Sequence, residues 1–353
     1  MKTDHGGNIW SAARRTGLSP REIMDFSSNI NDGPVEIPEK ILGRRDLLIP
    51  YPDLDTAQYL GAYSLYAGVP AGNILPGPGL TYLIYRFCQA HSGTAAVIVE
   101  PSFSEYAGAC QAAGINALRI LSDPDMMQKI AGTDFGIIFL ASPSNPVGDI
   151  IVPSMLERIV STAEKKGAIV FLDEAFADLA SGYDREFSVK LALGSDNLIV
   201  GRSLTKLIGM ASFRMGFLIG RAMELQRIRD VMEPWSLGQD ALEFLKEFNF
   251  SQFSDLPETI RRWRTELVEF MEANRFSVAG DPRANFISVR LPPEIQWDDL
   301  DMFLMERKIL VKFVTSVSHG GVLMRVAVKS PQKNAVLMNA ISEYLRRGVD
   351  RQP

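Results

Sequence analysis

Two cations lie close together in the stretch GRSLTKLIGMASFRMGFLIG, residues 201–220, which is otherwise poor in charged groups. Lys206 stands among small and apolar residues, and Arg214 comes just before an apolar run typical of a buried strand. Burial lowers a lysine pKa and so favours the neutral amine, which attacks an aldehyde to form a Schiff base. An arginine suits a phosphate, which it binds through charge-assisted hydrogen bonds. Lys206 taken alone is equally well explained as a surface lysine.

Further polar residues follow other predicted strands. The turn Gly77-Pro78-Gly79 precedes a predicted helix, whose first backbone N–H groups suit a phosphate. Asn145 follows a strand in SPSNPVG, and Asp173 ends the apolar run AIVFLD, where a buried carboxylate needs a partner. In an open α/β sheet, ligands bind outside the carboxyl ends of the strands. Taken singly, these residues are also explained as a turn, a loop residue and a cap.

The set as a whole is more specific than its members, and it matches pyridoxal phosphate. The aldehyde of this cofactor needs a lysine, and its pyridine nitrogen needs an acid partner so that the ring accepts electrons. Its ring oxygen needs a donor, and its phosphate needs backbone amides, hydroxyls and an arginine. The chain offers all of these groups at successive strand ends, from the turn at 77–79 to Arg214.

The elements that must position these residues alternate in type between about residues 75 and 220. Short apolar runs separated by helical patterns predict an α/β fold with a mostly parallel sheet, covered by helices on both faces. The predicted strands cover residues 95–99, 117–121, 136–141, 168–173, 198–203 and 215–220.

The pattern changes after about residue 255. A helix over 257–274 precedes the run NFISVRL, a helix over WDDLDMFLMERK, the runs ILVKF and LMRVAV, and a last helix. We therefore predict an N-terminal arm or piece of the small domain at 1–40, a large cofactor-binding domain at 41–255, and a smaller C-terminal α/β domain at 256–353.

Composition excludes several classes of protein. The 353 residues are 46% hydrophobic, with a net charge of −5, which argues against a nucleic-acid partner. Two cysteines and three scattered histidines argue against a metal site. The N-terminus lacks an apolar signal region, and every apolar run is shorter than the roughly 20 residues of a membrane span. We expect a cytoplasmic protein with no membrane partner.

The motifs SPSNPVG, DEAF, SLTK and FRMGFL, in this order and spacing, resemble the fold-type I enzymes that use pyridoxal 5′-phosphate. The resemblance covers nearly the whole chain. Within that family the chain most resembles the threonine-phosphate decarboxylases of cobalamin biosynthesis, the sister group of the histidinol-phosphate aminotransferases. The features that favour the decarboxylases are HGGN at 5–8, DFSSNIN at 25–31, YPD at 51–53 and LMRVAV at 323–328.

The resemblance implies a role for individual residues at the cofactor. Lys206 would bind its aldehyde, Asp173 would pair with its pyridine nitrogen, Asn145 would bond its ring oxygen, and Phe103 would stack on the ring. The phosphate would be held by residues of the predicted turn and of the strands behind it, together with a tyrosine from the other subunit of a homodimer with shared active sites. These phosphate ligands would be Gly79, Leu80, Thr81, Ser203, Arg214 and the partner copy of Tyr51.

The resemblance also implies a place for the substrate. Arg325 would bind an acid group of it, and His5, Gly6 and Asn29 would shape the pocket around its phosphate, beside Asn145. The chain also departs from the usual family pattern, and two of the departures are single residues. Val147 stands where the family often has threonine, and Phe176 stands where many sister aminotransferases have tyrosine. With Phe176, a second bond to the cofactor ring oxygen is missing. Because the lysine, aspartate, asparagine and arginine are intact, these departures bear on the identity of the substrate more than on use of the cofactor.

The expected activity is decarboxylation of L-threonine O-3-phosphate to (R)-1-amino-2-propanol phosphate, or of L-serine phosphate to ethanolamine phosphate. The sequence does not separate these two substrates, because one methyl group is worth only about 1–3 kcal/mol in a pocket. Two alternatives remain open. One is a histidinol-phosphate-type aminotransferase, which uses the same cofactor residues. The other is a non-catalytic regulator that binds pyridoxal phosphate.

Overall fold

The computed structural model describes residues 6–38, 40–41, 43–316 and 321–349. It confirms the predicted α/β fold with a mostly parallel central sheet. This sheet has seven strands in the order β2-β8-β7-β6-β5-β3-β4. β8 runs antiparallel to both of its neighbours, and the other pairs are parallel. The strands are β2 (Ile74–Gly77), β3 (Ala95–Glu100), β4 (Asn116–Leu121), β5 (Ile137–Ala141), β6 (Ile169–Asp173), β7 (Leu198–Ser203) and β8 (Gly216–Ile219).

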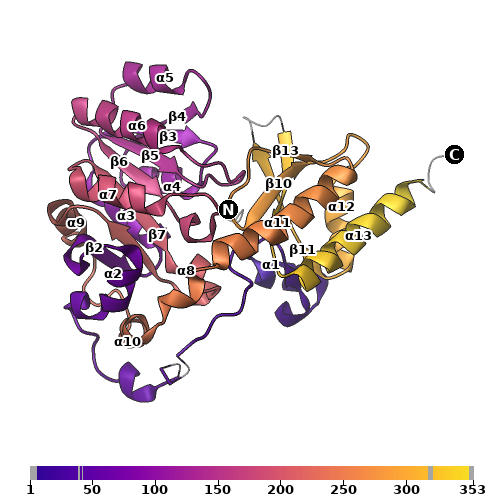
Figure 1. The fold of residues 1–353 in the computed structure, drawn as a ribbon, viewed down its shortest axis with the longest axis horizontal. Coiled ribbons are helices and arrows are strands. Elements are labelled where there is room, and N and C mark those ends of the chain that lie inside the picture. The colour runs from indigo at the N-terminus through magenta and orange to yellow at the C-terminus, as the bar shows by residue number, and fades with distance from the viewer. Residues whose placement is uncertain (1–5, 39, 42, 317–320, 350–353) are drawn as a thin grey trace.

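Helices cover both faces of this sheet (Figure 1). Alternate residues of a strand face opposite sides, so that Phe139 of β5 packs in one core cluster and Ile138 in the other. The first face is covered by α3 (Leu80–Ala90), α4 (Glu105–Ala112) and α9 (Ala222–Arg229). The second face is covered by α2 (Gly61–Ala67), α5 (Met126–Gly132), α6 (Pro153–Lys165), α7 (Arg185–Gly194) and α10 (Gln239–Glu247).

The C-terminal part forms a second, antiparallel sheet in the order β12-β13-β10-β9. A short parallel pair joins the N-terminal segment to the C-terminal part, because β1 (Met24–Asp25) pairs with β11 (Ile309–Leu310). The N-terminal residues therefore lie against the C-terminal part, as Figure 1 shows for α1 (Ile9–Thr16). The remaining elements are β9 (Ser277–Val278), β10 (Phe286–Arg290), β12 (Lys312–Ser316), β13 (Gly321–Ala327), α8 (Leu204–Leu207), α11 (Leu256–Ala273), α12 (Trp297–Glu306) and α13 (Pro331–Val349).

Two features of the large sheet differ from the sequence prediction. β2 is not among the predicted strands, although Ile74 and Leu75 are buried in it. The prediction makes β4 apolar and covered on both faces, but it is an edge strand on which Leu118 is 52% exposed. An edge strand has one neighbour, and only Ile120 of β4 is buried.

No helix among the described residues is long and apolar enough to span a membrane.

Candidate active site

A cavity of about 780 Å³ opens at the carboxyl ends of the parallel strands. Its lining comes from the loops after β3, β5 and β6, from the segment after β7, and from β12 and β13 of the second sheet. A smaller cavity of about 110 Å³ adjoins it and reaches to the last residues of β6 and β7. Both cavities are lined by Thr81, Phe103, Asn145, Phe176, Lys206 and Arg214. The structure thus brings most of the predicted cofactor residues around one space.

Lys206 lies on the one-turn helix α8, directly after β7. Its Nζ is 5.8 Å from the centre of the Phe176 ring, which borders both cavities. Burial, and then repulsion from Arg325 and Arg214, lowers the pKa of Lys206 to about 8, while Asp173 opposes the shift. At mildly alkaline pH a substantial fraction of this amine is therefore neutral and able to attack an aldehyde.

Asp173 is the last residue of β6 and is 7% exposed. The Tyr106 hydroxyl donates to its Oδ2 at 2.6 Å, and the Ala175 backbone N–H donates to its Oδ1 at 2.8 Å. Burial raises the pKa of Asp173, and these two bonds, together with Lys206, oppose that shift. Sequence reasoning missed Tyr106, which belongs to α4 and whose ring stacks on Phe139 in the core.

The residues predicted to bind the phosphate lie at and around the start of α3. Gly79 caps this helix with a φ of +92°, and the helix begins with Leu80 and Thr81, whose amides have no intrahelical acceptors. The Arg214 guanidinium lies against Gly79, because a Cβ there would stand only 2.6 Å from Arg214 Nη2. Leu80, Thr81 and Ser203 line the smaller cavity together with Arg214. Amides, hydroxyls and one guanidinium thus meet at one end of the site.

A Gly79→Ala substitution is expected to weaken binding of pyridoxal phosphate by about tenfold or more, because the new Cβ displaces Arg214. The matched control is Gly93→Ala. Gly93 has a similar φ of +86°, but no heavy atom lies within 4 Å of the position that its Cβ would take, so the control carries the backbone strain without the clash. Cofactor titration followed by absorbance measures both variants. Equal affinity in the two variants would contradict the role of the Gly79–Arg214 contact.

Asn145 and Arg325 both line the large cavity and are hydrogen-bonded to each other. Arg325 Nη1 donates to Asn145 Oδ1 at 2.7 Å, and Arg325 Nη2 donates to the Ser27 carbonyl at 2.9 Å. The Asn145 oxygen is thus engaged, so its amide N–H groups are the part suited to a ring oxygen. Burial lowers the pKa of Arg325 to about 10, while Asp25 opposes the shift, and the guanidinium stays charged at neutral pH.

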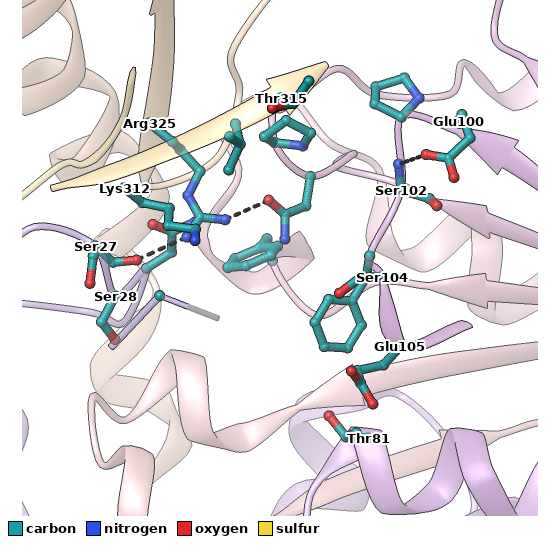
Figure 2. A pocket seen from close by; sticks show the side chains of 18 of the residues that line it. Ser27, Ser28, Thr81, Glu100, Ser102, Ser104, Glu105, Lys312, Thr315 and Arg325 are labelled. Atoms are coloured by element: carbon teal, nitrogen blue, oxygen red, sulfur yellow. Dashed lines mark hydrogen bonds between the residues drawn. The ribbon is translucent and has the colours of Figure 1, made fainter. Parts of the chain in front are cut away.

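A second cation stands beside Arg325. Lys312 of β12 is paired in register with Arg325 of β13, and both line the large cavity. Figure 2 shows the two side chains on one side of the pocket, with Ser27 and Ser28, opposite Glu105 and Thr81. Burial, and then Arg325, lowers the pKa of Lys312. The sequence prediction does not include Lys312.

Two of the predicted substrate residues, Gly6 and Asn29, also line the large cavity. Gly6 leaves no room for a side chain, because a Cβ would lie 2.1 Å from the Ser27 carbonyl oxygen and 2.8 Å from Arg325 Nη2. His5 lies outside the described residues. Tyr51 does not reach this chain's own cavity: it is 80% exposed, and its ring lies 4.8 Å from that of Trp235.

A buried ionic network lies behind the site, and sequence reasoning missed it. Arg202 Nε donates to Glu174 Oε2 at 2.6 Å, and Arg202 Nη1 lies 3.3 Å from Asp178 Oδ1. Arg185 Nη1 donates to the same Asp178 oxygen at 2.8 Å, and the Tyr183 hydroxyl donates to Glu174 Oε1 at 2.5 Å. Two carboxylates and two guanidinium groups balance one another. Glu174 directly follows Asp173, and Arg202 directly precedes Ser203.

The donor set of the smaller cavity fits pyridoxal phosphate. An amine of lowered pKa, a buried carboxylate and a primary amide surround a space bordered by Phe103, and a helix N-terminus with an arginine closes one end. The glycine at the helix cap leaves this cradle free of a side chain. Among the described residues there is no group of three histidine, cysteine or acidic side chains placed to hold a metal ion.

Comparisons with known proteins identify relatives of this chain. The chain is 30% identical to a threonine-phosphate decarboxylase of Salmonella typhimurium, over 97% of this chain and 96% of that protein. It is 27% identical to a histidinol-phosphate aminotransferase of Methanococcoides burtonii, over 96% and 94%. The structure superimposes on a histidinol-phosphate aminotransferase from Sinorhizobium meliloti in complex with pyridoxal-5′-phosphate with a TM-score of 0.82, at 16% identity and over 96% and 95% of the two chains. Residues 21–341 match the family model for aminotransferase class I and II, and the chain belongs to that family.

Proposed function

We propose that this protein is a pyridoxal 5′-phosphate-dependent decarboxylase of a phosphorylated amino acid, with L-threonine O-3-phosphate as its substrate. The observation that carries the proposal is the larger cavity, which is lined by Lys206, Asn145 and Arg214. It is also lined by two adjacent cations, Arg325 and Lys312. The product would be (R)-1-amino-2-propanol phosphate, a precursor of the cobalamin side arm. The relatives support a phosphorylated substrate, because decarboxylases of threonine phosphate and aminotransferases of histidinol phosphate are both among them.

The cofactor supplies an aldehyde that binds the substrate amine and a ring that accepts the electron pair left when a bond at Cα breaks. Lys206 would hold that aldehyde before the substrate arrives, and its amine would afterwards move a proton at Cα. Asp173 would pair with the pyridine nitrogen and keep it protonated. Phe103 and Asn145 would fix the plane of the ring, and the start of α3 with Arg214 would hold the phosphate. Each of these side chains lines one or both of the cavities.

Only the Cα bond that stands perpendicular to the cofactor ring overlaps its π system, so the orientation of the substrate decides which bond breaks. We propose that this orientation is set by Arg325, Lys312 and the segment 27–29. A decarboxylase has to turn the Cα–carboxylate bond into that position. One anchor would leave rotation about the N–Cα bond loose, whereas two anchored anions fix it. Arg325 has one face toward Asn145 and the cofactor side, and Lys312 stands beside it. We assign the substrate carboxylate to Arg325 and the substrate phosphate to Lys312, Asn29 and the N-terminal residues His5 and Gly6.

An aminotransferase of the histidinol-phosphate type is the second candidate, and the relatives favour it about as strongly in identity and coverage. It would use the same cofactor residues and hold the Cα–H bond perpendicular to the ring. A regulator that binds the cofactor without catalysis is a third candidate. The complete set of lysine, aspartate and arginine around one cavity argues against it.

The expected result is release of carbon dioxide from L-threonine phosphate without any keto-acid acceptor. Carboxyl-labelled substrate is supplied with and without 2-oxoglutarate, and labelled gas and keto product are followed. Unphosphorylated threonine should react poorly, because it lacks the anion that fixes the rotation. L-Serine phosphate, tested in parallel, shows how far the methyl group matters. Label that stays in solution, with keto product only in the presence of 2-oxoglutarate, would overturn the decarboxylase proposal in favour of the aminotransferase.

We further propose a homodimer with composite sites. The segment around Tyr51, together with Trp235, exposes several large apolar side chains to water. An exposed apolar patch of this kind is typical of a protein–protein interface. These side chains are Leu48, Ile49, Tyr51, Leu54 and Trp235. A two-fold dimer uses the same patch on each chain. We propose that this dimer brings Tyr51 to the cofactor phosphate of the other chain.

Mixing Lys206→Ala chains with Tyr51→Phe chains tests the sharing of sites. Composite sites predict that a mixed dimer contains one site with both substitutions and one with neither. Activity should therefore rise above that of either variant alone. Subunit exchange is verified separately by mass spectrometry of the intact dimers. Activity that stays at the unmixed level despite proven exchange would show that each site is built from one chain.

A further inference from the structure

The helix that carries Lys206 is only one turn long. A helix of this length leaves most of its carbonyl groups without intrahelical donors, and Leu204, Leu207 and Ile208 around it are buried. Its first half is held by Thr205, whose backbone N–H and hydroxyl both donate to the Met215 carbonyl at 3.3 Å. Its second half includes the carbonyls of Lys206 itself and of Leu207.

Asn31 satisfies both of these carbonyls. Its backbone N–H donates to the Lys206 carbonyl at 2.9 Å, and its side-chain Nδ2 donates to the Leu207 carbonyl at 3.0 Å. The side-chain Oδ1 accepts from the Gly33 N–H at 2.8 Å, which fixes the amide in this orientation. Asn31 is 6% exposed. Gly209 packs so closely on Asn31 that a Cβ there would lie 2.6 Å from the Asn31 carbonyl oxygen.

The segment that presents Asn31 is fixed at its other end to the C-terminal part. The Phe26 backbone N–H donates to the Leu310 carbonyl at 2.8 Å, and the Ala327 N–H donates to the Phe26 carbonyl at 2.8 Å. Between these contacts and Asn31, the Ser27 carbonyl accepts from Arg325 and Asn29 lines the cavity. Residues 26–31 therefore connect the sheet that carries Arg325 to the helix that carries Lys206.

We infer that Asn31 is a positioning residue for Lys206. It caps the end of α8 from the N-terminal segment and thereby fixes the backbone from which the lysine reaches the cavity. The hydrogen bonds of the Asn31 side chain go to the backbone of Leu207 and Gly33, so this side chain acts through the backbone of α8. This inference rests on the proposed role of Lys206, and its test uses a property of the chain that does not depend on that role.

Hydrogen–deuterium exchange of the full-length protein, with and without added pyridoxal phosphate, measures the order of α8 directly. Asn31→Ala keeps the backbone bond but removes the donor to Leu207. Exchange in the segment 204–209 is expected to become about tenfold faster, the size expected for one lost buried hydrogen bond. Asn31→Asp keeps the acceptor for Gly33 but replaces the donor with an acceptor, so it should loosen α8 at least as much as alanine does.

Asn334→Ala is the matched control. Asn334 is 1% exposed, and both ends of its side-chain amide are hydrogen-bonded to the backbone of Lys329. Its Oδ1 accepts from the Lys329 N–H at 3.0 Å, and its Nδ2 donates to the Lys329 carbonyl at 2.9 Å. Its replacement should loosen the start of α13 and leave the segment 204–209 unchanged. A common loss of stability would lower the melting temperature of both variants, but only the Asn31 variants should show faster exchange at α8.

Steady-state kinetics supply the second readout. The Asn31 variants should lose kcat about tenfold while KM for threonine phosphate stays about the same, because the lysine is displaced and the substrate anchors are not. Unchanged exchange at 204–209 in Asn31→Ala, or full recovery of exchange and kcat in Asn31→Asp, would overturn the inference. If the wild-type chain shows no decarboxylation, the proposed function fails, but the exchange data still decide whether Asn31 holds α8.

Discussion

A Lys206→Ala variant is expected to lose the covalent link to the cofactor and at least about a hundredfold in turnover, because both the attachment of the aldehyde and proton transfer at Cα lose their amine. The wild-type protein should be yellow, and borohydride should fix the cofactor onto Lys206. The amine is suited to this chemistry because its pKa is lowered to about 8 by burial, Arg325 and Arg214. Carbon dioxide release and mass spectrometry of the reduced protein measure the two effects.

Lys190→Ala is the control for this experiment. Lys190 lies on α7, where its side chain is 77% exposed and pairs with Glu186. Its removal should leave both colour and turnover unchanged. A borohydride adduct that maps to a lysine other than Lys206 in the wild-type protein would contradict the assignment, whatever the activity of the Lys206→Ala variant.

An Asp173→Asn variant is expected to bind pyridoxal phosphate more weakly and to turn over well over tenfold more slowly. A charge-assisted hydrogen bond to the ring nitrogen is worth about 1.5–3 kcal/mol, and the neutral amide does not keep that nitrogen protonated. The substitution also disturbs hydrogen bonds within the protein. Both carboxylate oxygens of Asp173 accept bonds, from the Tyr106 hydroxyl and from the Ala175 N–H. An amide offers only one oxygen, so one of these donors faces an NH₂ group.

Tyr106→Phe separates the two contributions. It removes one hydrogen bond to Asp173 but keeps the carboxylate charge, so its effect on turnover should be clearly smaller than that of Asp173→Asn. Single-turnover decarboxylation at saturating cofactor measures both variants. Wild-type turnover in Asp173→Asn would show that the carboxylate does not pair with the ring nitrogen.

The large sheet is predictable from the sequence where its strands are buried on both faces. Such strands are continuous apolar runs, and β5, β6 and β7 are recognisable in this way. β2 escapes the prediction because it has only four residues, ILPG, and two of them are a proline and a glycine, which are uncommon inside strands. β4 is recognisable as a strand, but most of its residues are exposed instead of buried on both faces. An apolar run does not reveal that the strand lies at the edge of the sheet.

The candidate site is predictable where residues follow strands and much less so where they come from elsewhere. Asp173 and Lys206 stand out because a polar residue at the end of an apolar run needs an explanation. Tyr106 gives no such signal, since an aromatic residue in a helix usually belongs to the core. Lys312 is one of many lysines, and only its register with Arg325 places it in the cavity. Local sequence patterns do not predict long-range strand pairing of this kind.

The ionic network behind the site constrains how β6 and β7 can pair. Side chains alternate between the faces of a strand, so Asp173 and Glu174 point to opposite sides of the sheet, as do Arg202 and Ser203. A shift of either strand by one residue would turn Glu174 or Arg202 into the cavity and leave the remaining charges of the network buried without partners. Breaking a buried ion pair in this way costs about 3–5 kcal/mol. A misaligned sheet would therefore both turn a charged residue into the cavity and leave buried charges unpaired. The network thus favours the one strand alignment that places Asp173 and Lys206 in the site.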